Sequence, residues 1–137
     1  MQGLKNIRLK EYDYRSNGYY FVTLVTRFRQ SKLEGRKDLL ERELDSLIRQ
    51  VSGLDVDYWN PMDNHVHLIF ILKECKLGLG EIVRRFKAKM SQAFHERLWQ
   101  PNYYEHVIRN EKALNRIREY IVNNPQAEIL KFEEFYK

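Results

Sequence analysis

The stretch 54–72, LDVDYWNPMDNHVHLIFIL, decides the fold of this chain. Its first part mixes apolar and polar residues and its last part is an apolar run, which predicts two strands, 54–60 and 65–72. Asp63 and Asn64 lie between them and favour a tight turn. The two strands are therefore expected to pair as a hairpin.

Apolar spacing predicts the other elements on either side of this hairpin. They are a strand at 19–27, helices at 36–52 and 81–97, a short strand at 103–108 and a final helix at 111–124. The order βαββαβ, followed by one more helix, predicts an α+β fold: a ferredoxin-like sandwich with an antiparallel sheet. We expect one domain over 1–137, with an irregular basic arm at 1–17 and a C-terminal tail at 126–137.

Two histidines, His65 and His67, flank one apolar residue at the head of the second hairpin strand. Side chains two positions apart in a strand point to the same face of the sheet. Both imidazoles would lean toward one point and can offer two nitrogen ligands to a metal ion. The alternative is an ordinary pair of strand histidines, one hydrogen-bonded and one exposed.

The final helix is amphipathic and carries a tyrosine near its end. Asn110 is a suitable N-cap, and apolar residues recur at helical spacing at Ile117 and Ile121. Tyr120 and Asn124 are four positions apart and therefore share a helix face. A phenol has a pKa near ~10 and is a poor nucleophile, but it becomes competent beside a metal-activated phosphate. The alternative is a boundary aromatic on a packing helix.

Together these segments resemble a known family, the single-tyrosine transposases of the HUH class (histidine, hydrophobic residue, histidine). The REP-associated tyrosine transposases are the most similar branch. The resemblance is carried by four blocks in the same order: 19–26, 62–69, 99–109 and 120–125. The family usually has proline where this chain has Asp63, which lies in the predicted turn and is not one of the family's ligands.

The resemblance implies a ferredoxin-like fold with an additional C-terminal helix that carries the nucleophile Tyr120. It implies one Mg²⁺ or Mn²⁺ ion held by His65, His67 and Asn124, and no nucleotide cofactor. Such an enzyme would cleave and join hairpin-flanked, single-stranded DNA through a 5′-phosphotyrosine. The alternatives are a non-cleaving hairpin-DNA-binding protein of the same fold and a replication-initiator-like nickase.

Composition is compatible with this interpretation. The chain has 137 residues, 43% of them hydrophobic, and a net charge of +5, which favours a polyanionic partner but also occurs in proteins that bind no nucleic acid. Its only cysteine, Cys75, permits neither an internal disulfide nor a thiolate metal site. No signal peptide or membrane-spanning stretch is recognisable, so we expect a cytoplasmic protein with no membrane partner. A homodimer is left open.

Cations and aromatics elsewhere are candidate DNA contacts, because such side chains contact phosphates and stack on unpaired bases. The alternatives are a solvated helix face, an arm that packs on the sheet, and a structural histidine. The candidates are Arg8, Tyr12, Tyr14 and Arg15 in the arm, Arg84, Arg85, Lys87 and Lys89 on the second helix, and His106 and Arg109 near the last strand.

Overall fold

The computed structural model describes residues 17–123 of the chain. In chain order its elements are β1 (Gly18–Val25), the short 3-10 helix η2 (Arg27–Arg29), α1 (Lys37–Gln50), β2 (Leu54–Pro61), β3 (His65–Leu72), α2 (Leu79–Phe94), β4 (Tyr104–Ile108) and α3 (Glu111–Asn123). The four strands form one antiparallel sheet in the order β2-β3-β1-β4. This is the ferredoxin-like arrangement, so the predicted α+β fold is confirmed.

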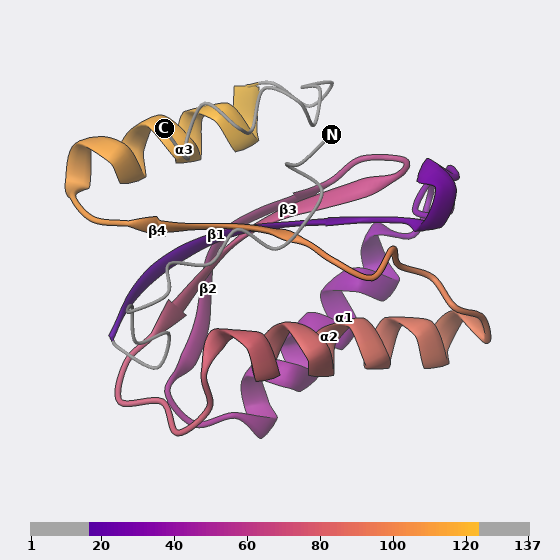
Figure 1. Cartoon of the computed structure of the whole chain (residues 1–137), viewed down its shortest axis with the longest axis horizontal. Coiled ribbons are helices and arrows are strands. Elements are labelled where there is room, and N and C mark those ends of the chain that lie inside the picture. The colour runs from indigo at the N-terminus through magenta and orange to yellow at the C-terminus, as the bar shows by residue number, and fades with distance from the viewer. Residues whose placement is uncertain (1–16, 124–137) are drawn as a thin grey trace.

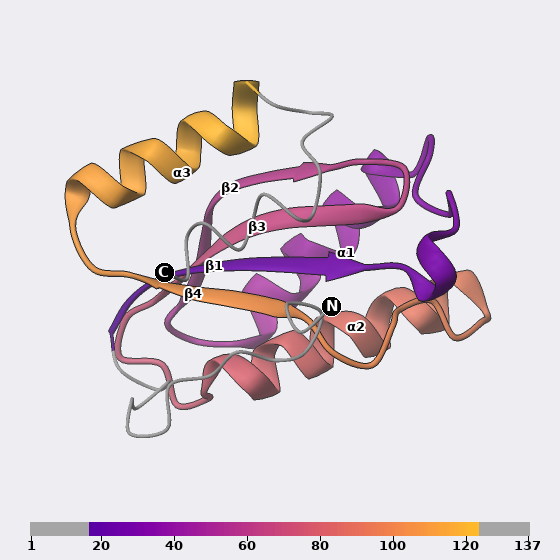
Figure 2. The same cartoon turned by 45° about the horizontal axis from the view of Figure 1, so that its top comes forward.

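Both faces of the sheet are covered. Figures 1 and 2 show α1 and α2 on one face and α3 alone on the other. The larger core lies between the sheet and the helix pair and includes Leu40 and Phe86. A smaller core between the sheet and α3 includes Phe21, Ile69 and Ile117. Because β1 and β3 are central strands buried on both faces, their sequences are apolar runs with little alternation.

Local sequence signals set the elements that carry the candidate residues. Strand β3 begins and ends where predicted, and the backbone N–H of Met62 donates to the carbonyl of His65 across the predicted turn at 2.7 Å. At the start of α3, the side-chain oxygen of Asn110 accepts a hydrogen bond from the backbone N–H of Ala113 at 2.8 Å. This is the predicted N-cap, and it fixes the start of the helix that carries Tyr120.

Most elements differ from their predicted bounds by one to three residues; α1, for example, spans Lys37–Gln50 rather than 36–52. The ends of β1 and α2 have clear local causes. Strand β1 stops at Val25, two residues early, because the chain turns into η2 directly after the extended residue Thr26. The hydroxyl of Thr26 donates to the carbonyl of Gln30 at 2.6 Å. Helix α2 spans Leu79–Phe94 rather than 81–97, because His95 adopts a left-handed conformation (φ 56°) that terminates it. The early end of β1 leads into the exposed segment η2.

Candidate active site

The two histidines of β3 lie on the sheet face that α3 covers. Their ring centroids are 4.8 Å apart at an angle of 72°. His65 is 6% exposed and His67 is fully buried. The predicted convergence of the two imidazoles on one face is therefore what the structure has, and neither ring is the exposed histidine of the alternative interpretation.

The orientation of each imidazole is fixed through its Nδ1 atom. Nδ1 of His65 lies 2.7 Å from the side-chain oxygen of Asn64, and Nδ1 of His67 lies 2.6 Å from the hydroxyl of Thr23. An amide oxygen only accepts, so Nδ1 of His65 carries the proton and Nε2 carries the lone pair. Within residues 17–123, no polar atom bonds this buried Nε2 atom. A hydrogen bond on one ring nitrogen that leaves the other to bind is the usual arrangement of a metal-ligating histidine.

Both imidazoles are neutral near pH 7. Burial, followed by the positive charge of Arg29, lowers the pKa of His65 to about 4, while Asp63 opposes the shift. Burial, followed by repulsion from His65, lowers the pKa of His67 well below its usual value. A histidine must be neutral to bind a metal, so the site holds both side chains in the ligating form.

Tyr120 on α3 completes the cluster. Its ring centroid lies 5.5 Å from that of His67 and 6.3 Å from that of Phe21, at steep angles to both. Ile117 and Ile121, on the same helix, are buried in the smaller core and hold α3 against the sheet. The structure thus brings together three predicted site residues from segments more than fifty positions apart; their chemical roles remain predictions.

Two polar contacts that the sequence did not suggest fix α3 relative to β2. Arg118 forms a bidentate ion pair with Asp57, with nitrogen–oxygen distances of 2.7 and 2.8 Å. The side-chain amide of Asn60 donates to the carbonyl of Ile121 at 3.0 Å. These contacts flank Tyr120 in sequence, so they set its height above β3. No local spacing rule reveals them, because each joins residues 61 positions apart.

The described residues supply two of the predicted metal ligands, the imidazoles of His65 and His67. Two neutral imidazoles by themselves suit Zn²⁺ or Ni²⁺, and they suit Mn²⁺ or Mg²⁺ when oxygen ligands complete the shell. Among residues 17–123, no cluster of three or more His, Cys, Asp or Glu side chains is present. The predicted third ligand, Asn124, lies outside the described residues. The site therefore fits a divalent ion provided that oxygen atoms supply the other positions.

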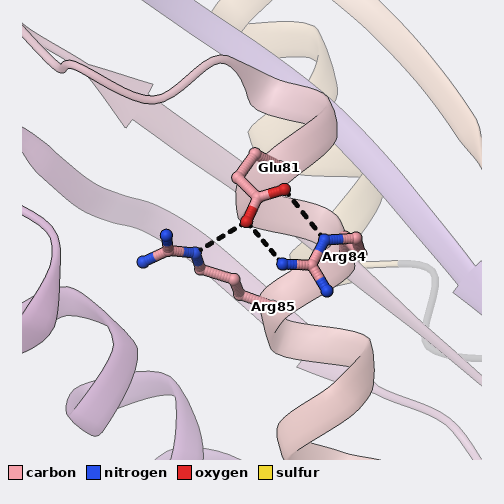
Figure 3. Close-up of polar contacts among 3 residues, drawn as sticks. All are labelled: Glu81, Arg84 and Arg85. Atoms are coloured by element: carbon pink, nitrogen blue, oxygen red, sulfur yellow. Dashed lines mark hydrogen bonds and ion pairs between the residues drawn. The ribbon is translucent and has the colours of Figure 1, made fainter.

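Helix α2, which carries four candidate DNA-binding cations, covers the sheet face opposite α3 (Figure 1), whereas His67 packs beside Tyr120 of α3. Figure 3 shows Arg84 and Arg85 sharing the carboxylate of Glu81, at 2.6–2.9 Å. Lys87 donates to the carbonyls of residues 100 and 101, and Lys89 donates to a serine hydroxyl on α1. The structure does not bring these four cations to the histidine site, and their contact with DNA remains a prediction.

His106 lies on the same sheet face as the site but two strands away from β3. It pairs with Phe21 across β1 and β4, and burial lowers its pKa to about 4. Arg109 follows β4 and is exposed. The predicted arm, except for Asn17, and the predicted tail lie outside the described residues. The arm contains four of the candidate DNA contacts, Arg8, Tyr12, Tyr14 and Arg15.

Comparison with known proteins points to one family. The family model described as "Transposase IS200 like" matches residues 14–124. An uncharacterized protein of Haemophilus influenzae is 33% identical over 159 aligned positions, which cover 88% of this chain and 87% of that protein. The REP-associated tyrosine transposase of Escherichia coli is 27% identical over 113 positions, covering 82% of this chain and 68% of that protein.

A solved structure shares the fold. The structure of a REP-associated tyrosine transposase bound to a REP hairpin superposes with a TM-score of 0.76 at 25% identity. The match covers 88% of this chain and 73% of the other. In the described part of the present chain, no helix is both long and apolar enough to cross a membrane.

Proposed function

This chain belongs to the IS200-like transposase family, and from that premise we propose that it is a metal-dependent endonuclease and strand transferase for single-stranded DNA. Tyr120 is the nucleophile, and His65 and His67 hold one Mg²⁺ or Mn²⁺ ion. Asn124 is the third ligand. The substrate is DNA flanked by a hairpin, by analogy with the relative whose structure contains a REP hairpin.

One observation carries the proposal: the ring of Tyr120 lies 5.5 Å from the ring of His67, centroid to centroid. A phenol has no structural need for two buried neutral imidazoles, whereas phosphoryl transfer needs a nucleophile beside an electrophilic centre. The three residues meet within one chain, so no second copy is required to assemble them. If the protein forms a dimer, bringing these three residues together is not the reason for it.

The reaction balances with few groups. The phenolic oxygen of Tyr120 attacks the scissile phosphorus, an O–P bond forms, and the bond from phosphorus to the 3′ oxygen breaks. The proton of the phenol ends on the 3′ oxygen, which leaves as a free hydroxyl. A bound divalent ion would supply charge stabilisation on the phosphate oxygens. The covalent ester keeps the bond energy, so a second 3′-hydroxyl can reverse the step and join strands without ATP.

The chain's own residues contribute positioning. Thr23 and Asn64 hold the two imidazoles in fixed orientations. Burial keeps the imidazoles neutral. Fixed positions matter because the ordering of a nucleophile and phosphate before reaction lowers the barrier by several kcal/mol, up to about 7–11 in ideal cases.

The test is covalent capture. A labelled hairpin oligonucleotide with single-stranded flanks is incubated with Mn²⁺ or Mg²⁺, and with EDTA as control. We expect an adduct that survives denaturing electrophoresis and maps to Tyr120 by mass spectrometry, absent in Tyr120→Phe and retained in the control Tyr58→Phe. An adduct on another tyrosine would show that Tyr120 is not the nucleophile. Cleavage without any adduct makes water the nucleophile, and binding without cleavage makes the protein a hairpin binder.

A further inference from the structure

A second feature of the molecule lies beside the histidine site. A cavity of about 590 Å³ is lined by residues of two segments, 27–29 and 97–101. The lining residues include three arginines, Arg27, Arg29 and Arg97, and two aromatic residues, Phe28 and Trp99. Cavities of this size that combine apolar walls with a few polar groups are typical of binding sites for small groups. None of these residues was among the candidate DNA contacts.

Phe28 is in an unusual position for an apolar residue. Its side chain is 79% exposed, and its backbone is left-handed, with φ 56° and ψ 20°. Arg29 is also left-handed, with φ 54°. Such a conformation strains any residue other than glycine, and strained backbone is concentrated at functional sites. The guanidinium of Arg27 lies 5.0 Å from the ring centroid, so the ring is held as a platform rather than packed in a core.

Among the described residues that line the cavity, three are arginines and none is acidic. In the described part of the chain, Arg27, Arg29 and Arg97 form no ion pair with a carboxylate. This differs from Arg84 and Arg85 on α2, whose charges are balanced by Glu81 (Figure 3). Unpaired arginines around an exposed ring fit a ligand that has both a flat base and a phosphate.

A short hydrogen-bonded path joins this cavity to the candidate metal site. The side-chain amide of Asn64 lies 3.4 Å from the carbonyl of Arg29, to which it donates, and its oxygen lies 2.7 Å from Nδ1 of His65. The backbone N–H of Thr26 also donates to the carbonyl of Asn64 at 2.9 Å. One residue of the hairpin turn thus touches both η2 and the first histidine, so a strand that reaches the histidines passes close to η2.

We propose that the η2 cavity, defined by residues 27–29 and 97–101, binds one unpaired nucleotide of the single strand next to the scissile phosphate. The base stacks on Phe28, and the arginines contact the backbone phosphates on either side. This inference rests on the proposed function, because it assigns part of the substrate of the same enzyme. The segment η2 would then help the enzyme to recognise the single-stranded flank of its DNA substrate.

The test measures binding without chemistry. Fluorescence anisotropy in EDTA compares a hairpin that has a single-stranded flank with the same hairpin without one. For the wild type, the flank strengthens binding. For Phe28→Ala, we expect the flanked hairpin to bind roughly five- to hundredfold more weakly, as expected for loss of one stacked base, while the blunt hairpin is unaffected. Phe28→Trp should restore flank binding, and the control Tyr58→Ala, which removes an exposed ring beside Arg118, should not change it.

An abasic scan identifies the nucleotide. Removal of one base at a time from the flank should reveal a single position whose loss weakens wild-type binding and has no further effect in Phe28→Ala. The proposal is overturned if Phe28→Ala keeps the flank preference, or if every abasic position weakens both proteins equally. Adduct formation is scored separately: an adduct with no Phe28 effect rejects only the cavity, and a Phe28 effect with no adduct rejects only the transferase.

Discussion

The ion pair between Asp57 and Arg118 should control the rate of adduct formation more than it controls stability. The pair is bidentate, with side chains 13% and 30% exposed. Exposed pairs contribute about 0.2–1 kcal/mol, and bidentate, partly buried geometry strengthens them. We expect a coupling of about 1 kcal/mol in a double-mutant cycle of Asp57→Asn and Arg118→Gln. Melting temperature should fall by about 3–5 °C in the single variants.

The effect on catalysis should be larger because Tyr120 lies two residues from Arg118. Displacement of a reacting group by about 1 Å can cost about a hundredfold in rate. For Asp57→Asn we expect the rate of adduct formation at saturating DNA to fall at least tenfold, with DNA affinity unchanged, because this variant removes no cation. A structural role alone would lower the amount of folded protein and leave the rate per folded molecule intact.

The assay is single-turnover adduct formation with labelled hairpin DNA, quantified on denaturing gels and normalised to folded protein by circular dichroism. Glu81→Gln is the matched control: it breaks the exposed ion cluster on α2 (Figure 3), on the sheet face opposite α3. Its rate at saturating DNA should equal that of the wild type. If Asp57→Asn loses the expected stability and still reacts within twofold of the wild type, the pair does not position Tyr120.

Three further outcomes follow from individual residues. The double variant His65→Ala/His67→Ala should lose Mn²⁺ binding, measured by calorimetry, and form no adduct. Its hairpin affinity in EDTA should stay within about threefold of the wild type, since phosphate contacts supply most of the affinity. Retained Mn²⁺ binding would place the ion elsewhere. Phe28→Gly should be about 1 kcal/mol more stable than Phe28→Ala in urea, because glycine tolerates the left-handed backbone; equal midpoints would argue against strain. Gly53→Ala should destabilise by about 2–4 kcal/mol, because φ is 88° and a Cβ would lie 2.5 Å from the carbonyl oxygen of Lys73; an unchanged urea midpoint would contradict this.

Local sequence rules were sufficient for the elements and for part of the site. The alternation of strand side chains placed His65 and His67 on one face, and they lie on one face. Helical spacing and a capping asparagine placed Ile117 and Ile121 inward on the last helix, and both are buried. These rules act over a few residues, so one sequence contains all the information that they need. The order of the elements then restricted the topology to the sandwich that the structure has.

Only the tertiary structure shows which side chains of β2 face the candidate site, because the pairing of β2 with β3 contains one β-bulge. Strict alternation along β2 would put Asn60 on the same face as Val56, toward α1 and α2. A register shift between Val56 and Trp59 lets both of those side chains pack on the larger core and leaves Asn60 opposite His67, under α3. The bulge adds one residue to one strand, so it reverses the face of everything after it.

The contacts that complete the site depend on this register and on the height of α3 together. Asn60 reaches the carbonyl of Ile121 because the bulge turns the end of β2 toward the helix. Asp57, the neighbour of Val56, already faces α3 by simple alternation, and Arg118 reaches it there. The sequence was sufficient to identify the candidate residues His65, His67 and Tyr120, since their types and spacings are local properties. The fold decided which residues hold them in place, because packing between distant segments selects those partners and no short stretch of sequence encodes it.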